Sequence, residues 1–252
     1  MSATETDTVL TELDRDCLPH LSVNAVIFGA HAGALKVLLM QSAGTGTWSL
    51  PGGYVRRIES INDAAARMIR ERTGLADTVL RQFYTFGTPD RGEAVVAHAL
   101  RAMGIEAPAD HWVLGRVVSV GYVALVDSSR AQVVPDAWTR AHAWWDLAER
   151  PALILDHNDM VARALEWVRA QLDDLPLGAN LLPVAFTMPE LQRLYETVLD
   201  RPLDRRNFQK RMLELGLVER LPDQRIGSRR KPTYMYRWAS SDADRGDPRA
   251  VG

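Results

Sequence analysis

The chain has 252 residues, of which 46% are apolar and 25% charged, with a formal net charge of −2. This is the composition of an ordinary globular protein, and the length suits one large domain or a domain with a small module. A single cysteine, Cys17, excludes an intrachain disulfide, and no apolar run approaches the roughly 18 residues of a membrane span. Because the first 16 residues are acidic and polar and resemble no secretory signal, we expect a cytoplasmic protein with a flexible N-terminus over residues 1–19.

Charge is distributed unevenly along the chain. Residues 201–238 carry eleven basic and four acidic side chains, a net charge of +7, which leaves −9 on the rest. An acidic body joined to a basic C-terminal segment indicates two functions in one chain.

The first predicted elements are two strands and a helix. Residues 22–28 and 35–41 are short aliphatic runs joined by a glycine-containing stretch, which predicts a hairpin. The period then changes to that of a helix beginning at Ser60, which can cap the first turn together with Asp63. Gly74 is placed to end this helix in a left-handed conformation.

The middle of the chain continues the alternation of strands and helices. Further strands are expected at three apolar stretches, residues 78–86, 116–126 and 141–147. The connection over residues 87–115 is long, so we expect part of it to be helical. An amphipathic stretch predicts a helix over residues 156–172. Strands combined with two long helices indicate an α/β sandwich over residues 20–172.

The last third of the chain follows a different pattern. A linker is predicted over residues 173–186, and a capping box of Thr187 and Glu190 begins the next helix. Asp204 can cap a second helix, which Gly216 ends. The inward face of this second helix is expected to carry Phe208, Met212 and Leu215. Two further strands are expected after it.

Two helices followed by two strands, over residues 187–238, are typical of a winged helix-turn-helix domain, and the polar tail 239–252 is expected to be disordered. Arginine, lysine and amide side chains can contact phosphates and base edges. The residues expected to bind DNA lie on the second helix and in the loop between the strands: Arg205, Arg206, Asn207, Gln209, Lys210, Arg211, Arg229, Arg230 and Lys231. A solvated basic face without a DNA partner is the alternative interpretation.

The helix that begins at Ser60 lies in a recognisable motif. The sequence resembles the Nudix signature at Gly53, Glu59, Arg67, Ile69, Glu71, Gly74 and Leu75, at the family's spacing. The resemblance implies that residues 20–172 form a Nudix-like α/β/α sandwich with a mixed sheet. In working Nudix enzymes, carboxylates at the positions of residues 68, 71 and 72 hold Mg²⁺ against a pyrophosphate.

Two of those three positions depart from the family pattern. Met68 offers a thioether, which is a poor ligand for Mg²⁺, and Arg72 places a positive charge where a main ligand should be. At ~4 Å, such a charge costs a cation on the order of 4 kcal/mol per unit charge. We therefore predict no catalytic residues, no bound metal and no cofactor. Arg67 and Glu71 are expected to form an i, i+4 pair within the residual motif Gly53, Glu59, Arg67, Glu71 and Gly74.

The two halves together resemble the Nudix-related transcriptional regulators, a family with ADP-ribose-responsive regulators of NAD metabolism and an arabinose-responsive branch of repressors. The resemblance implies a homodimer on double-stranded operator DNA, and an effector that is a pentose or an ADP-ribose-like metabolite. The expected ligand-binding residues are Trp48, Glu59, Arg67, Arg91 and Arg116. The family runs directly from a stretch like residues 86–91 into the strand at Arg116, whereas this chain carries extra residues over 92–115.

Two other interpretations stay open. The first is a Mg²⁺-dependent pyrophosphohydrolase of the ADP-ribose type with an appended DNA-binding module, in which Glu59 and Glu71 are the remaining metal-binding groups. The second is a DNA-bound scaffold without a ligand.

Overall fold

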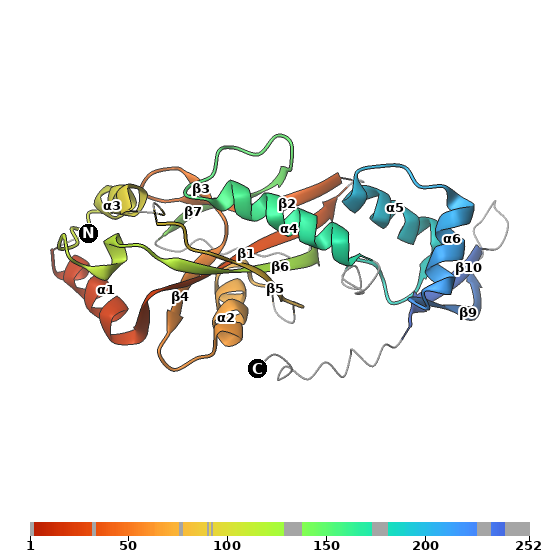
Figure 1. The fold of residues 1–252 in the computed structure, drawn as a ribbon, viewed down its shortest axis with the longest axis horizontal. Helices are drawn as coiled ribbons and strands as arrows, with labels where there is room; N and C mark the ends of the chain where they lie inside the picture. The colour runs from red at the N-terminus through yellow and green to blue at the C-terminus, as the bar shows by residue number, and fades with distance from the viewer. Residues whose placement is uncertain are drawn as a thin grey trace. The chain divides into compact units, whose positions relative to one another are not determined.

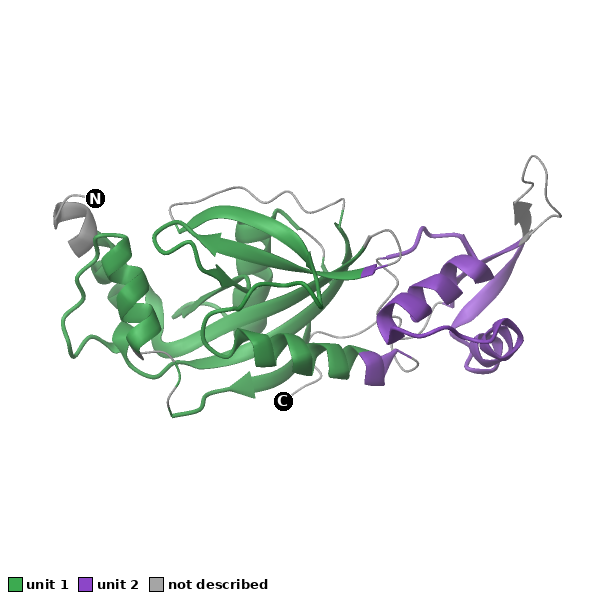
Figure 2. Ribbon diagram, turned by 90° about the horizontal axis from the view of Figure 1, so that it is seen from above, with its two compact units in different colours: residues 1–31, 35–168 green, residues 32–34, 169–252 purple. Residues whose placement is uncertain are grey.

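The computed structural model describes residues 3–31, 34–75, 78–89, 91, 93–128, 138–172, 181–225 and 233–239. They form two compact units, one from residues 1–31 and 35–168 and the other mainly from residues 169–252 (Figure 2). The domain boundaries predicted from the sequence stay predictions beside this division. Within the described segments, no helix is both long enough and apolar enough to cross a bilayer.

A mixed β-sheet forms the centre of the first unit (Figure 1). Its seven strands among the described residues are β1 (Cys17–His31), β2 (Ala34–Ser42), β3 (Trp48–Ser49), β4 (Gly52–Arg56), β5 (Arg81–Phe86), β6 (Val118–Asp127) and β7 (Thr139–Asp146). The order is β3-β2-β1-β6-β5, with β4 also paired to β1 and β7 to β2. β1 and β6 run parallel, while β5 is antiparallel to β6. The predicted hairpin of the first two strands is confirmed by the pairing of β1 with β2.

Helices cover both faces of this sheet (Figure 1). Helix α2 (Ile61–Thr73) begins at the cap Ser60 and ends at Gly74, whose φ is 67°, as predicted. Its buried face packs against alternate residues of β6, among them Tyr122 and Ala124. Figure 1 shows α4 (His157–Gln171) on the other side of the sheet. The α/β/α fold class expected for this part of the chain is therefore confirmed.

The N-terminus differs from its prediction. Residues 3–16, expected to be flexible, form helix α1 (Ala3–Asp16), whose Leu10 is buried. Leu10 packs in a small apolar cluster with α3 (Glu93–Ala102) and the 3₁₀ helix η1 (Trp112–Leu114). The extra residues 92–115 supply α3 and η1, so the long connection is partly helical as expected. The sequence missed α1 because its apolar partners lie about 90 residues away.

The second unit has the element order of a winged helix. Its described strands β8 (Phe186–Thr187), β9 (Val218–Arg225) and β10 (Thr233–Trp238) pair in the order β8-β10-β9. Helix α5 (Met188–Leu199) begins with the complete capping box of Thr187 and Glu190, and α6 (Arg205–Glu214) is capped by Asp204. Phe208 and Met212 are buried as predicted. Leu215 was expected to face inward, but it is 46% exposed because α6 ends before it.

Candidate functional site

The Nudix motif is built from β4, the turn that follows it, and helix α2. Strand β4 pairs with β1, which places Gly53 beside the helix, and a Cβ on Gly53 would lie 3.6 Å from the Met68 Cγ atom. The turn delivers Glu59 next to the cap residue Ser60. Local sequence and strand pairing therefore fix the surviving motif residues around Arg67.

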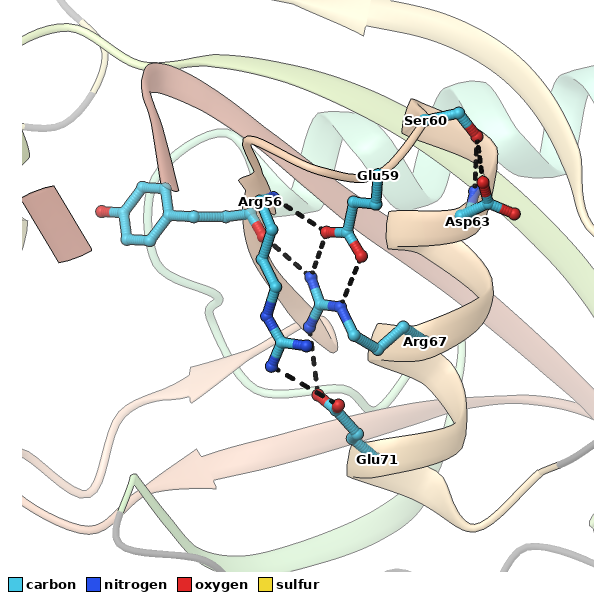
Figure 3. A network of polar contacts seen from close by, with 7 residues as sticks. Arg56, Glu59, Ser60, Asp63, Arg67 and Glu71 are labelled. Carbon is cyan, nitrogen blue, oxygen red and sulfur yellow. Dashed lines mark hydrogen bonds and ion pairs between the residues drawn. The ribbon is translucent and has the colours of Figure 1, made fainter. Parts of the chain in front are cut away.

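Arg67 is the centre of a polar network (Figure 3). Its Nε and Nη2 atoms donate to the two carboxylate oxygens of Glu59 at 2.8 and 2.6 Å, and Nη1 donates to Glu71 at 3.0 Å. Nη2 also donates to the Tyr54 carbonyl at 3.1 Å. The Arg56 backbone N–H donates to Glu59 at 2.8 Å, and the Arg56 side chain lies 3.7 Å from Glu71. The predicted Arg67–Glu71 pair is present.

Glu59 and Arg67 stabilise each other in their charged forms. Hydrogen bonds from Arg67 hold the pKa of the Glu59 carboxyl below its usual range, against the effect of partial burial. The same bonds raise the pKa of the Arg67 guanidinium. Both groups thus stay charged and paired at any physiological pH, and both Glu59 oxygens are occupied by donors.

The two altered positions do not suit a metal ion. Met68 is 2% exposed and belongs to the apolar cluster between α2 and the sheet. The Arg72 Nη1 atom donates to the Thr139 hydroxyl on β7 at 3.1 Å. Within the described ranges, no group of three or more His, Cys, Asp or Glu side chains is arranged to hold a metal. The residues present do not fit the Mg²⁺ site of a Nudix enzyme.

A separate cavity of about 710 Å³ opens in the first unit. One wall is the end of β5 and the following loop, residues 84–88, with Arg91 and Val95; the other is the start of α4, with Leu155, Asp156, Asp159 and Arg163. This volume is in the range of small-molecule sites. None of the Arg67 network's side chains lines it. The cavity is therefore the first candidate for a ligand site.

A buried ion pair forms one side of the cavity. Arg91 has a side chain only 4% exposed, and its Nε atom lies 2.9 Å from both carboxylate oxygens of Asp156. Its Nη1 atom donates to the Val117 carbonyl at 2.8 Å. This bond fixes the guanidinium to the segment that immediately precedes strand β6. His157, the residue after Asp156, accepts a hydrogen bond at its Nδ1 atom from the Leu50 backbone N–H. Burial, followed by the charge of Arg91, lowers the pKa of His157 to about 4.

The five predicted ligand-binding residues are spread over three places. Arg91 lines the cavity, and Arg116 reaches its edge by donating from Nη2 to the Gly87 carbonyl. Glu59 and Arg67 form the network described above. Trp48 packs edge-on against Trp145, with ring centroids 5.5 Å apart, and does not line the cavity.

The predicted DNA-binding side chains of α6 lie mostly on its exposed face. Arg205, Arg206, Asn207, Lys210 and Arg211 are exposed, while Gln209 is half-buried. Lys210 pairs with Glu214 one turn on, at 3.7 Å, and both side chains remain well exposed. The predicted wing residues Arg229, Arg230 and Lys231 fall outside the described residues.

Comparison with known proteins identifies both units. Residues 18–168 match the model of the NUDIX domain. The chain belongs to the Nudix family. Residues 178–238 match the NrtR DNA-binding winged helix domain. The predicted resemblance to Nudix-related regulators is thereby confirmed.

Individual relatives span most of the chain. The ADPR responsive transcriptional repressor NtrR of Acinetobacter baylyi is 28% identical over 241 residues, which is 92% of this chain and 87% of the relative. The crystal structure of Shewanella oneidensis NrtR complexed with a 27mer DNA is similar with a TM-score of 0.66 and 28% identity, covering 86% of this chain and 93% of that chain. An ADP-ribose pyrophosphatase of Methanocaldococcus jannaschii is 25% identical over 135 residues, which is 52% of this chain and 67% of the relative.

Of the residues that line the cavity, only Arg91 was predicted from the sequence, and the polar side chains of Tyr84, Asp156, Asp159 and Arg163 are among those that were missed. Tyr84 lies in the stretch 78–86, which the sequence predicts only as a strand, and Asp156 is the first residue of the helix predicted over residues 156–172. The signal in the sequence was the set of charged side chains near the start of α4, Asp156, Asp159 and Arg163. Such charges are equally typical of a solvated helix end.

Proposed function

We propose that this protein is a ligand-responsive transcriptional regulator, in which the winged helix binds operator DNA and the Nudix domain binds an ADP-ribose-like metabolite. The protein acts as a homodimer in the cytoplasm, since a two-fold protein suits an operator with two half-sites. The named response of the Acinetobacter relative to ADPR supports the choice of effector.

The observation that carries the proposal is the state of the Nudix motif in a chain that continues into a winged helix. Two of the three metal-ligand positions hold no carboxylate, because they are occupied by Met68 and Arg72. Met68 is buried among apolar side chains, and Arg72 donates a hydrogen bond to Thr139. Both carboxylate oxygens of Glu59 accept hydrogen bonds from Arg67. A Nudix domain in this state retains a small-molecule cavity without a metal centre, which suits a sensor better than a hydrolase.

The DNA-binding role rests on α6. Its exposed face carries four basic side chains and Asn207, and arginine and asparagine are the side chains that read guanine and adenine in the major groove. Exposed lysine and arginine also neutralise phosphates, which supplies most of the affinity at low salt.

The alternative function is a Mg²⁺-dependent pyrophosphohydrolase with an appended DNA-binding module. It is favoured by the survival of Glu59 and Glu71 and by the similarity of the first unit to a protein named as an ADP-ribose pyrophosphatase. The engagement of both carboxylates by Arg67 counts against it.

A linkage experiment tests the proposal. ADP-ribose is titrated into the full chain with and without an operator duplex selected by the protein from a random library. A regulator must bind the effector with different affinity in its two states, and a coupling of ~1–3 kcal/mol changes operator affinity ~5–150-fold. The affinity for ADP-ribose must then change by the same factor when operator is present. Equal ADP-ribose affinity in both titrations would exclude it as the effector.

A further inference from the structure

Helix α4 belongs to both units of the chain (Figure 2). Its first two turns supply Asp159 and Arg163 to the cavity of the first unit. Its last turn, from Arg169 onward, belongs to the second unit. A single helix therefore leads from the candidate ligand site into the DNA-binding unit, and the contacts of its C-terminal end decide what a movement of the helix can reach.

Two hydrogen bonds fasten this end of α4 to helix α5, and both lie within the second unit. The Tyr195 hydroxyl donates to the carbonyl of Leu172, the residue that follows α4, at 2.7 Å. The Arg169 Nε atom donates to the Val198 carbonyl in the last turn of α5, at 2.9 Å. Carbonyls at the end of a helix have no partner within that helix, so the two side chains supply bonds that the helices cannot make for themselves.

The tyrosine contact is shielded from water. Tyr195 is 2% exposed and Leu172 is 4% exposed. Burial raises the pKa of Tyr195 to about 12, so the hydroxyl keeps the proton that it donates. If α4 moved while α5 stayed in place, a buried hydroxyl and a buried carbonyl would lose their partners, at a cost comparable with a ~5–150-fold change in an equilibrium constant. We therefore expect a displacement of the end of α4 to carry α5 with it.

Helix α5 is in turn held to α6, the helix with the exposed basic face. The Tyr195 ring packs edge-on against Phe208 of α6, with centroids 5.1 Å apart. The turn between the two helices is fixed by Glu196, whose carboxylate accepts from the Gln192 side chain and from the Leu203 backbone N–H, both at 2.9 Å. Gln192 also donates to the Leu203 carbonyl. These contacts join α5 and α6 into one block, which we call the α5–α6 block.

We propose that Tyr195 and Arg169 are positioning residues that transmit effector binding to the DNA-binding helix, by fastening the end of α4 to the α5–α6 block. The inference rests on the proposed function, because it concerns how occupancy of the cavity changes operator binding. Neither side chain lines the cavity, and neither is among the residues expected to bind DNA. Their removal should thus leave each binding event intact and reduce the coupling between the two.

The test measures the operator affinity of the full chain by fluorescence anisotropy, with and without saturating ADP-ribose. The ratio of the larger affinity to the smaller is the coupling factor, ~5–150 for a regulator. Tyr195→Phe keeps the aromatic ring against Phe208 and removes only the hydroxyl, while Arg169→Met keeps an apolar side chain and removes the donor. Each variant should lower the coupling factor by about fivefold or more. The affinities for ADP-ribose alone and for operator alone should stay within about twofold of the wild type.

Tyr236→Phe is the matched control, since Tyr236 is a buried tyrosine on β10 of the same unit. It should keep the wild-type coupling factor, and urea unfolding verifies that every variant is folded in the assay. Hydrogen exchange supplies a second measurement that a merely structural role would not change. ADP-ribose should alter the exchange of the α5 amides in the wild type and in Tyr236→Phe, but far less in Tyr195→Phe.

The outcomes separate the inference from the proposed function. If the wild type is coupled and both Tyr195→Phe and Arg169→Met keep its coupling factor, the inference is wrong while the proposed function stands. If the wild type binds both partners but ADP-ribose leaves its operator affinity unchanged, the proposed function is wrong and the inference fails with it. If Tyr195→Phe loses operator binding even without ADP-ribose, a wild-type coupling factor in Arg169→Met overturns the inference, and a lowered one supports it.

Discussion

Arg67 and Glu59 form a two-point ion pair in which both carboxylate oxygens accept from one guanidinium, at 2.8 and 2.6 Å (Figure 3). The two side chains are only 14% and 12% exposed. Such a pair is planar, directional and shielded from solvent, so it orders the turn between β4 and α2. The residues that identify the motif in the sequence serve here to hold the polypeptide in place.

The first prediction compares the two carboxylates that Arg67 binds. Glu59→Gln should lower the free energy of unfolding by about 2–3 kcal/mol, because a shielded charged hydrogen-bond pair is lost. Glu71 is 49% exposed, so Glu71→Gln should cost under about 1 kcal/mol. Urea unfolding at neutral pH measures both. A larger cost for Glu71→Gln would contradict the structural role assigned to Glu59.

The second prediction concerns catalysis. With Mg²⁺ or Mn²⁺, the purified protein should hydrolyse ADP-ribose negligibly, because Met68 and Arg72 supply no carboxylate to a metal. Product release is measured by chromatography over hours, with an active Nudix hydrolase as the positive control. A turnover near ~1 s⁻¹, within the usual range of enzymes, would establish the hydrolase alternative.

The third prediction concerns restoring the missing ligands. Met68→Glu places a carboxylate in the apolar cluster between α2 and the sheet, where an unpaired charge costs several kcal/mol. We expect this variant to unfold at lower urea concentration than the wild type and Mg²⁺ not to stabilise it. Arg72→Glu is the matched variant, because it introduces the same carboxylate at a position that is only half-buried. Stabilisation of Met68→Glu by millimolar Mg²⁺ would show that the site can reopen to a metal.

The fourth prediction follows from the buried histidine. The pKa of His157 is lowered to about 4, so the folded protein keeps it neutral while the unfolded chain takes up a proton below pH ~6.5. Stability is therefore fully present above pH ~6.5 and declines as the pH falls toward 4, by about 2 kcal/mol between pH 7 and pH 5. Urea unfolding at the two pH values should show this decline.

Two variants isolate the contribution of His157. His157→Gln should lose that part of the decline, whereas His142→Gln, which alters an exposed histidine on β7, should keep it. An identical pH dependence in the wild type and His157→Gln would mean that His157 is not the group responsible.

The fifth prediction concerns the DNA-binding surface. Arg206→Ala and Lys210→Ala should each weaken operator binding without changing stability, since both side chains are exposed. A residue that contacts only phosphate should weaken all sequences alike and reduce the salt slope by about one unit. A base-reading residue should relax preference at one position, at a cost of ~1–3 kcal/mol.

Arg101→Ala is the control for these variants, because Arg101 is an exposed arginine at the end of α3 in the other unit. Fluorescence anisotropy at several salt concentrations supplies the affinities. Unchanged operator affinity in the Arg206→Ala, Lys210→Ala double variant would show that α6 is not the recognition helix.

The sequence by itself determined the local features. Ser60, Thr187 and Asp204 begin helices as predicted, and Gly74 ends one, because caps and left-handed glycines depend on a few neighbouring residues. The spacing of the Nudix motif and its two substitutions could also be recognised in the sequence, and so could the basic C-terminal unit. These signals were enough to predict both folds and the class of function.

Tertiary structure decided which distant residues meet. The cavity joins Tyr84 and Arg91 to Asp156 and Arg163, some 65 to 80 positions later, and α1 finds its apolar partners in residues 93–114. No periodicity encodes such contacts, because they depend on how β5, the following loop and α4 pack around one sheet. For the same reason Asp156 serves Arg91, although its sequence position is that of a helix cap.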